Sequence, residues 1–360
     1  PTGLYGIEKY YNADLAAGNE IRLTLDRNIQ TQSESVLREL MEKFGAKSGT
    51  IIVEDPSSGK ILALANAPDF NPNLYSKSPI ENFLNPATQS VYEPGSVFKP
   101  LTMATGIDLG AITPETTFYD SGSVTINGEE IKNWDLKAHG TVTMTNVLEQ
   151  SINTGAVFAA RKVGKKNFLK YTKRFGFGEK TGIDLPDEVT GSLKNLERKN
   201  SKEIDLATAS FGQGTAVTPI QLIGAFGSLA NGGKLMRPYL DAEENPHVVR
   251  KTMSKETSEK VTRMMESAVE KAFVAALPEH RIAGKTGTAQ IADLERGGYT
   301  EEYNHTYVGF GPASDPKFVA LIKLERPRAI LAGATVVPAF RELARFIINY
   351  YNIPPDKTTE

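Results

Sequence analysis

Three short groups of residues in this sequence combine a hydroxyl with an amine or an amide at spacings that permit chemistry. The first lies in Glu93–Pro100, EPGSVFKP, where Ser96 stands three residues before Lys99. A Pro-Gly pair breaks the chain ahead of Ser96, and Pro100 is tolerated only in the first turn of a helix. The pattern therefore predicts a helix that begins close to Ser96. Residues three apart share a helix face, so the Lys99 amine can lie beside the Ser96 hydroxyl.

The second group is Ser151-Ile152-Asn153, and the third is Lys285-Thr286-Gly287-Thr288. Ser151 and Asn153 fall in a helical pattern or in the turn beside it, where capping of a helix is the simpler role. The third group lies in an apolar segment that predicts a strand. Each group is weak by itself, but three of them in the order S-x-x-K, S-x-N, K-T-G are hard to attribute to chance.

Two further copies of these motifs show why spacing alone is insufficient. Ser57 and Lys60 repeat S-x-x-K within PSSGK, the turn of a predicted hairpin, and glycine there disfavours a helix. The triplet Lys180-Thr181-Gly182 repeats K-T-G within a glycine-rich loop. We expect neither copy to be functional.

A serine hydroxyl becomes a useful nucleophile only beside a base. Lys99 can be that base only when neutral, whereas a free lysine has a pKa near 10.4. Burial and a second nearby ammonium would both favour the neutral form.

Histidine is a poor alternative base in this sequence. The four histidines lie in polar segments and are predicted to be solvated; they are His139, His247, His280 and His305. Ser96 lies in no G-x-S-x-G motif, and the chain contains no H-E-x-x-H motif. His139 and Trp134 lie just upstream of Ser151, so they either border the same cleft or, for Trp134, belong to the core.

Composition excludes several classes of protein. The 360 residues carry a net charge of -2, which gives no indication of nucleic-acid binding. The absence of cysteine excludes thiolate chemistry, disulfides and cysteine-ligated metals. No apolar run is long enough to span a bilayer, and no signal peptide opens the chain. We predict no cofactor and no metal, and the start without methionine suggests a piece of a longer protein.

Hydrophobic periodicity predicts the elements that must position these residues. A helix over 26–45 has Ile29, Val36, Leu37, Leu40 and Met41 inward and stops at Gly45. Further helical patterns cover 145–164, 165–176, 218–233, 254–273 and 336–351, and strand patterns cover a hairpin at 49–68 and segments 281–291, 306–314 and 317–325. Met264 and Met265 are expected in the core of their helix. Strands at both ends with helices between them predict one sheet assembled from distant parts of the chain.

With these motifs, the sequence resembles the transpeptidase domain of class B penicillin-binding proteins over nearly its whole length. Family-like blocks include PSSGKILALANAPDFNPN, YEPGSVFKP, FGFGEKTGIDLPDE, SFGQGTAVTPIQL, GKTGTAQ and VGFGPASDPKF. Asn153 and the run FGQG at 211–214 look more like the division (septal) branch than the elongation branch. The segment 238–252 is short for the family.

The resemblance implies an α/β, serine β-lactamase/transpeptidase-like fold, an antiparallel sheet covered by helices with a mainly helical subdomain. Residues 1–20 would be a remnant of the N-terminal pedestal region and residues 21–355 the penicillin-binding transpeptidase domain. It also implies an anchor by one N-terminal helix outside this sequence, which would hold the domain at the extracytoplasmic (periplasmic) face of the membrane. Partners would include a glycan polymerase and divisome or elongasome proteins, and no nucleic acid.

The resemblance also assigns roles at the site. Ser96 would be the nucleophile, Lys99 its base and Ser151 a proton relay, with Lys285 supplying the second ammonium. Asn153 would orient the substrate backbone. In the K-T-G-T segment, Lys285, Thr286 and Thr288 would hold a carboxylate, with Gly287 between them. The amides of Ser96 and Thr288 would form the oxyanion hole. The substrates implied are peptidoglycan stem peptides ending in D-Ala-D-Ala, and β-lactams would acylate Ser96.

Two alternatives remain open on sequence alone. A carboxypeptidase or β-lactamase would need a carboxylate that activates water, and Glu179, Glu188 and Glu203 are available. A non-enzymatic β-lactam sensor domain would use the same scaffold only to bind the drug.

Overall fold

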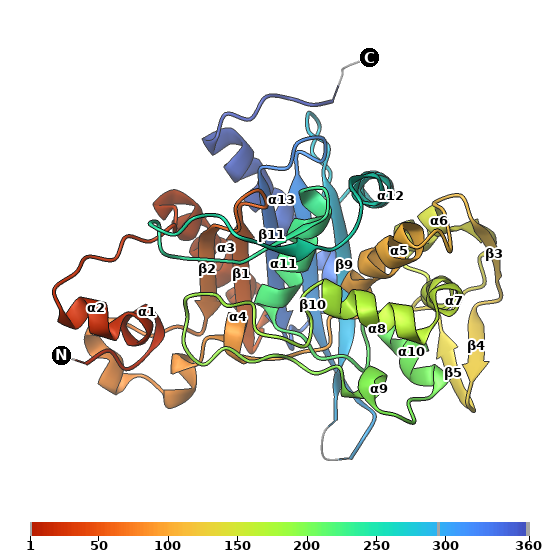
Figure 1. Cartoon of the computed structure of the whole chain (residues 1–360), viewed down its shortest axis with the longest axis horizontal. Coiled ribbons are helices and arrows are strands. Elements are labelled where there is room, and N and C mark those ends of the chain that lie inside the picture. Colours follow the sequence, from red (N-terminus) through yellow and green to blue (C-terminus); the bar gives the residue numbers. More distant parts are fainter. Residues whose placement is uncertain (1, 294–295, 358–360) are drawn as a thin grey trace.

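The computed structural model describes residues 2–293 and 296–357, and its centre is an antiparallel sheet in the order β2-β1-β11-β10-β9 (Figure 1). The strands are β1 (Ser48–Glu54), β2 (Ile61–Ala67), β9 (Ala283–Ala292), β10 (Tyr299–Gly311) and β11 (Phe318–Glu325). Two come from near the start of the chain and three from near its end. The prediction of one sheet from distant parts of the chain is therefore confirmed.

Each face of this sheet has its own core, because successive side chains of a strand point to opposite faces. Ile51 and Ile322 pack with α3 (Arg27–Phe44) and α13 (Val336–Tyr350). Ile52 and Leu321 belong instead to the larger core that contains α11 (Pro219–Ala230) and α12 (Lys255–Ala272). The result is a sheet between two layers of helices.

A mainly helical part lies beside the β9 edge of the sheet, next to small two-stranded sheets (Figure 1). Its helices are α5 (Lys99–Asp108), α6 (Met144–Glu149), α7 (Asn153–Val163), α8 (Lys165–Arg174), α9 (Lys194–Glu197) and α10 (Glu203–Ala209), with the 3-10 turn η3 (Gly95–Phe98) leading into α5. The short helix α4 (Pro86–Gln89) lies instead against α11, β1 and β2. The small sheets pair β3 (Thr117–Asp120) with β6 (Gly140–Thr143), β4 (Ser123–Ile126) with β5 (Glu129–Lys132), and β7 (Lys234–Met236) with β8 (Val248–Lys251).

The remaining elements are short. They are α1 (Gly6–Tyr10), α2 (Asn12–Ala16) and the 3-10 turns η1 (Pro72–Lys77), η2 (Ile80–Phe83) and η4 (Ala332–Ala334). The first two helices dock on the domain, because the hydroxyl of Tyr11 donates to Asp184 Oδ2 at 2.6 Å. Within the described residues, no helix is both long and apolar enough to cross a membrane.

Most of the predicted elements are present where expected. Helix α3 ends at Gly45, whose φ of 54° is the left-handed conformation that glycine favours. Its predicted inward residues are buried except Met41, which is partly exposed. Met264 and Met265 are core residues of α12, as expected.

Two expectations about histidine were wrong. His305 and His280 are buried rather than solvated.

The burial of His305 follows from the length of strand β10. This strand begins at Tyr299 instead of at Thr306, because the polar run before Thr306 continues the backbone pairing with β9. This pairing carries His305 under the segment before α13, where Thr335 Oγ1 lies 2.9 Å from its Nδ1 and the Ile330 carbonyl 3.3 Å from its Nε2. Burial lowers the pKa of His305 to about 4.

Candidate active site

The turn that carries Ser96 lies directly against strand β9. Gly95 adopts a φ of 63°, and a Cβ built there would lie 2.8 Å from Ala289 Cβ. A Cβ at Gly287 would lie 2.7 Å from the carbonyl oxygen of Pro94. Such separations are shorter than carbon and oxygen atoms tolerate, so glycine is required on both sides. The predicted start of a helix near Ser96 is confirmed, with η3 as its first turn.

The amine of Lys99 is completely buried below this turn. Its Nζ donates to Ser151 O at 2.5 Å, to Ser151 Oγ at 3.1 Å and to Asn153 Oδ1 at 2.8 Å. Burial first, and then the positive charge of Lys285, lower the pKa of Lys99 well below its usual value. Among the described residues, no hydrogen bond joins Lys99 Nζ to Ser96 Oγ. The Lys99 amine, which was expected beside the Ser96 hydroxyl, is hydrogen-bonded to Ser151 and Asn153 instead.

Ser151 connects the two lysines. It lies in the turn between α6 and α7 with a φ of 57°, and its Oγ also accepts from Lys285 Nζ at 3.0 Å. Lys285 is 4% exposed, and burial lowers its pKa to about 7. A neutral Lys99 could therefore receive the Ser151 proton while Lys285 donates to the same oxygen.

The other predicted residues border the same place. Lys285 Nζ contacts Thr286 O at 3.2 Å and Thr286 Oγ1 at 3.4 Å. Thr288 Oγ1 accepts from the Ala332 amide at 3.1 Å, which leaves its own proton available for an incoming acceptor. Because β9 is an edge strand, alternate backbone N–H groups face away from the sheet.

Asn153 begins helix α7 with its side chain held at both ends. Its Oδ1 accepts from Lys99, and its Nδ2 donates to Lys132 O at 2.8 Å. The second hydrogen of this side-chain amide donates to no acceptor within the described part of the chain, so it is available to a carbonyl oxygen. The structure thus brings together Ser96, Lys99, Ser151, Asn153 and Lys285–Thr288.

The duplicate motifs lie elsewhere with simple structural roles. Ser57 is exposed, and its Oγ donates to Asp55 Oδ1 at 2.7 Å in the β1–β2 turn. Thr181 Oγ1 donates to Glu188 Oε1 at 2.6 Å. Neither takes part in the contacts of Lys99.

Sequence reasoning missed several residues around the site. Glu93 accepts from the Gly214 amide and from the Tyr299 hydroxyl, both at 2.9 Å, and burial raises its pKa. Its place beside the Pro94-Gly95 turn was the available signal. Trp134 is 58% exposed and its Nε1 donates to Gln150 O at 2.9 Å, so it borders the site and is not a core residue.

No group of three or more His, Asp or Glu side chains that could hold a metal ion occurs within residues 2–293 and 296–357. The chemistry available is that of two serine hydroxyls, Ser96 and Ser151, and two buried amines, Lys99 and Lys285. This is an arrangement for acyl transfer, in which a nucleophile, a base and N–H donors converge.

Comparison with known proteins agrees with this geometry. The model of the penicillin binding protein transpeptidase domain matches residues 49–345. Stage V sporulation protein D of Bacillus subtilis is 32% identical over 406 aligned residues, which cover 99% of this chain and 62% of that protein. Peptidoglycan D,D-transpeptidase FtsI of Escherichia coli is 31% identical over 359 residues, 98% of this chain and 60% of its own length.

Solved structures have the same fold. The transpeptidase domain of penicillin-binding protein 3 from Burkholderia pseudomallei superimposes with a TM-score of 0.83 at 28% identity, covering 94% of this chain and 98% of that one. Penicillin binding protein 3 from Mycobacterium tuberculosis, complexed with aztreonam, gives 0.85 at 27% identity, covering 94% and 80%.

The chain therefore belongs to the penicillin-binding protein transpeptidase domain family, and the resemblance and fold expected from the sequence are confirmed. It spans only about three fifths of the length of these two curated relatives.

Proposed function

We propose that this chain is a serine D,D-transpeptidase domain that cross-links peptidoglycan stem peptides through an acyl-enzyme on Ser96. The observation that carries the proposal is the buried chain of contacts from Lys99 through Ser151 to Lys285, directly beneath the turn of Ser96. Relatives named peptidoglycan D,D-transpeptidases and a neighbour solved with aztreonam support it.

Acylation follows from the protonation states. Neutral Lys99 takes the proton of Ser96 as Oγ attacks the carbonyl carbon of the penultimate D-alanine. The amides of Ser96 and Thr288 receive the oxyanion charge. Ser151 passes its proton to the departing nitrogen and receives from Lys99 the proton that came from Ser96, and D-alanine leaves.

Transfer then reverses these movements. The amine of a second stem attacks the ester carbon and gives a proton to Lys99. The bond between the ester carbon and Ser96 Oγ then breaks, and Ser96 is released. Before D-alanine leaves, Lys285, Thr286 and Thr288 hold the terminal carboxylate of the donor stem, and Asn153 donates to the backbone of that stem. A β-lactam follows the first step as a mimic of the donor.

The hydrolase alternatives have less support. The three carboxylates considered above for the activation of water have other partners: Glu179 pairs with Arg250, Glu188 accepts from Thr181 and Gly182, and Glu203 pairs with Arg161. A sensor domain that the drug acylates would need the same nucleophile and base, and the relatives named peptidoglycan D,D-transpeptidases favour the enzyme over the sensor.

For the whole protein we propose a septal role, on Asn153 and the run FGQG at 211–214, and a location at the extracytoplasmic face of the membrane. Partners would be a glycan polymerase and division proteins. Residues 1–20 would be the end of a pedestal region, docked through Tyr11.

The test is covalent labelling with a fluorescent penicillin. Ser96→Ala should abolish the adduct without changing the melting temperature, whereas the matched variant Ser57→Ala should label normally. Peptide mapping by mass spectrometry should find the penicilloyl group on Ser96. An adduct on any other serine would refute the assignment.

A further inference from the structure

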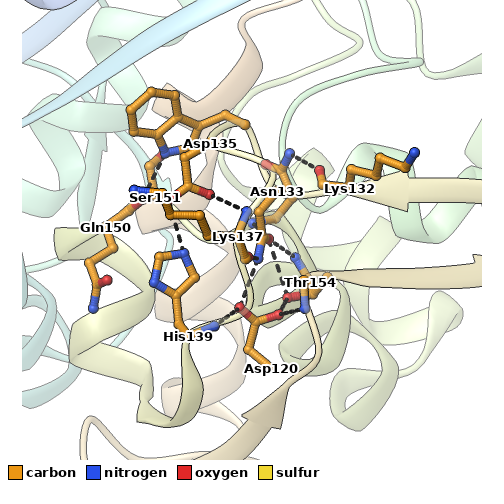
Figure 2. Close-up of polar contacts among 12 residues, drawn as sticks. Asp120, Lys132, Asn133, Asp135, Lys137, His139, Gln150, Ser151 and Thr154 are labelled. Atoms are coloured by element: carbon orange, nitrogen blue, oxygen red, sulfur yellow. Dashed lines mark hydrogen bonds and ion pairs between the residues drawn. The ribbon is translucent and has the colours of Figure 1, made fainter.

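Three consecutive residues, from Lys132 at the end of β5 to Trp134, contact the chain on both sides of Ser151 (Figure 2). On the side after Ser151, the carbonyl of Lys132 accepts from Asn153 Nδ2 at 2.8 Å, and Asn133 Oδ1 accepts from the Asn153 amide at 3.1 Å. On the side before it, Trp134 Nε1 donates to Gln150 O at 2.9 Å. The segment 132–134, here called the flanking segment, thus brackets the serine.

The flanking segment is itself fixed by a buried carboxylate. Asp120, at the end of β3, is 0% exposed and accepts from Asn133 Nδ2 at 2.7 Å, from Thr154 Oγ1 at 2.6 Å and from the amides of Gly122 and His139 at 2.9 and 3.0 Å. Burial alone would raise the pKa of Asp120, but these hydrogen bonds outweigh it and hold the pKa below its usual value.

An ionised carboxylate accepts only, so it decides which way the Asn133 amide points. Asn133 Nδ2 must face Asp120, and Oδ1 is left to accept from the first amides of α7, those of Asn153 and of Thr154 at 3.3 Å. These amides would otherwise lack partners at the start of the helix. Asp120 therefore sets the orientation of the Asn133 amide, and with it the direction of the bonds from α7 to Asn133 Oδ1.

Ser151 needs such support because its φ of 57° is a conformation that residues other than glycine rarely adopt. Conformations of this kind persist only where the surroundings determine them. The residues on either side of Ser151 also fix the Ser151 carbonyl oxygen and Asn153 Oδ1, two of the three acceptors of Lys99 Nζ.

Resting on the proposed function, we propose that Asp120, Asn133 and Trp134 are positioning residues for acylation, which hold Ser151 and Asn153 in the geometry that Lys99 requires. None of the three contacts the reacting atoms. If they are loosened, Ser151 and Asn153 move relative to Lys99, and the fold of the sheet and its helices remains.

The experiment measures the rate constant of Ser96 acylation by fluorescent penicillin as a function of pH, well below each variant's melting temperature. Asp120→Asn and Asn133→Ala should slow acylation at least about tenfold. Water admitted around Lys99 would bring its pKa back toward the ordinary value, so the acidic limb of the profile should move to higher pH. The titratable group that faces Lys99 is Lys285 of β9, which these variants leave unchanged.

Asp108→Asn is the matched control. Asp108, at the end of α5, also accepts from several donors, Tyr171 Oη at 2.6 Å, the Ser254 amide at 2.8 Å and Thr257 Oγ1 at 3.0 Å, but it has no contact with the flanking segment. Its replacement should lower the melting temperature and leave both the acylation rate and the pH profile unchanged.

Trp134→Phe keeps a smaller aromatic ring at an exposed position and removes the N–H donor to Gln150, so it tests the proposal even if Asp120→Asn fails to fold. It should slow acylation several-fold with little change in melting temperature. If folded Asn133→Ala and Trp134→Phe showed the same rates and pH profiles as the wild type, the inference would be overturned. Labelling of the wild-type protein would still support the proposed function in that case. An unlabelled wild type would instead refute both.

Discussion

At the scale of single residues, the site depends on two lysines whose surroundings differ. Lys99 is buried and its charged form is opposed by desolvation and by Lys285, whereas desolvation alone accounts for the lowered pKa of Lys285, about 7. Lys99 is placed to accept a proton, and Lys285 faces Thr286 at the edge where a carboxylate would bind.

We therefore expect Lys99→Arg to reduce acylation by about a hundredfold or more, because a guanidinium cannot serve as a base near neutral pH. Lys285→Arg keeps a cation for the carboxylate and should lose about tenfold or less. In wild type the rate should rise with pH as Lys99 becomes neutral above its lowered pKa, and it should fall as Lys285, whose pKa is about 7, loses the charge that holds the carboxylate. Acylation rates measured from acid to alkaline pH check this, and equal losses in the two variants would contradict the separate roles.

At the scale of elements, the decisive contact is between the 3-10 turn η3 and the edge strand β9. Gly95 and Gly287 let the two backbones approach more closely than any side chain would allow. This approach places the amide of Ser96 beside the edge of the strand that carries Thr288, as an oxyanion hole requires.

Gly287→Ala should separate the turn from the strand, because its Cβ would lie 2.7 Å from Pro94 O and 3.1 Å from Val97 Cγ1. A shift of this size is expected to slow acylation by about a hundredfold with the fold retained. Gly333→Ala is the control, since nothing lies within 4 Å of its Cβ. The two variants are compared by acylation rate and by circular dichroism; a normal rate in Gly287→Ala would show that the close approach is dispensable.

At the scale of the whole molecule, the site forms where the helical part meets the β9 edge of the sheet (Figure 1). Ser96 and Lys99 come from η3 and α5, Ser151 and Asn153 from the turn into α7, and Lys285 from β9. The carboxylates considered for water activation lie in ion pairs or loop contacts of their own.

We accordingly expect the penicilloyl-Ser96 adduct to persist from minutes to hours, because no carboxylate among these three is aimed at the ester. Intact-protein mass spectrometry after removal of free drug measures its lifetime. Loss of the adduct within seconds, together with catalytic accumulation of hydrolysed penicillin, would favour the hydrolase. Glu188→Gln serves as a control, since its effect should be on the 181–188 loop and not on the lifetime.

By itself the sequence determined the family, most of the helices and strands, and the residues that gather at the site. These features depend on local rules: hydrophobic periodicity identifies α3 and α12, and a proline-glycine break marks the turn before Ser96. The order of the motifs then selected Ser96 over Ser57 and Lys285 over Lys180. The neighbours of Ser57 indicate a turn, and those of Lys180 indicate a loop.

Only the tertiary structure decided which groups touch. Asp120 and Asn133 lie in polar segments with no periodic signal, and their importance comes from contacts with α7 across about twenty residues or more of chain. His305 was assigned to solvent because its neighbours are polar, yet strand pairing buries it. Lys99 contacts Ser151 rather than Ser96, because a buried ammonium is satisfied by whichever oxygens the fold brings to it, and those oxygens are distant in sequence.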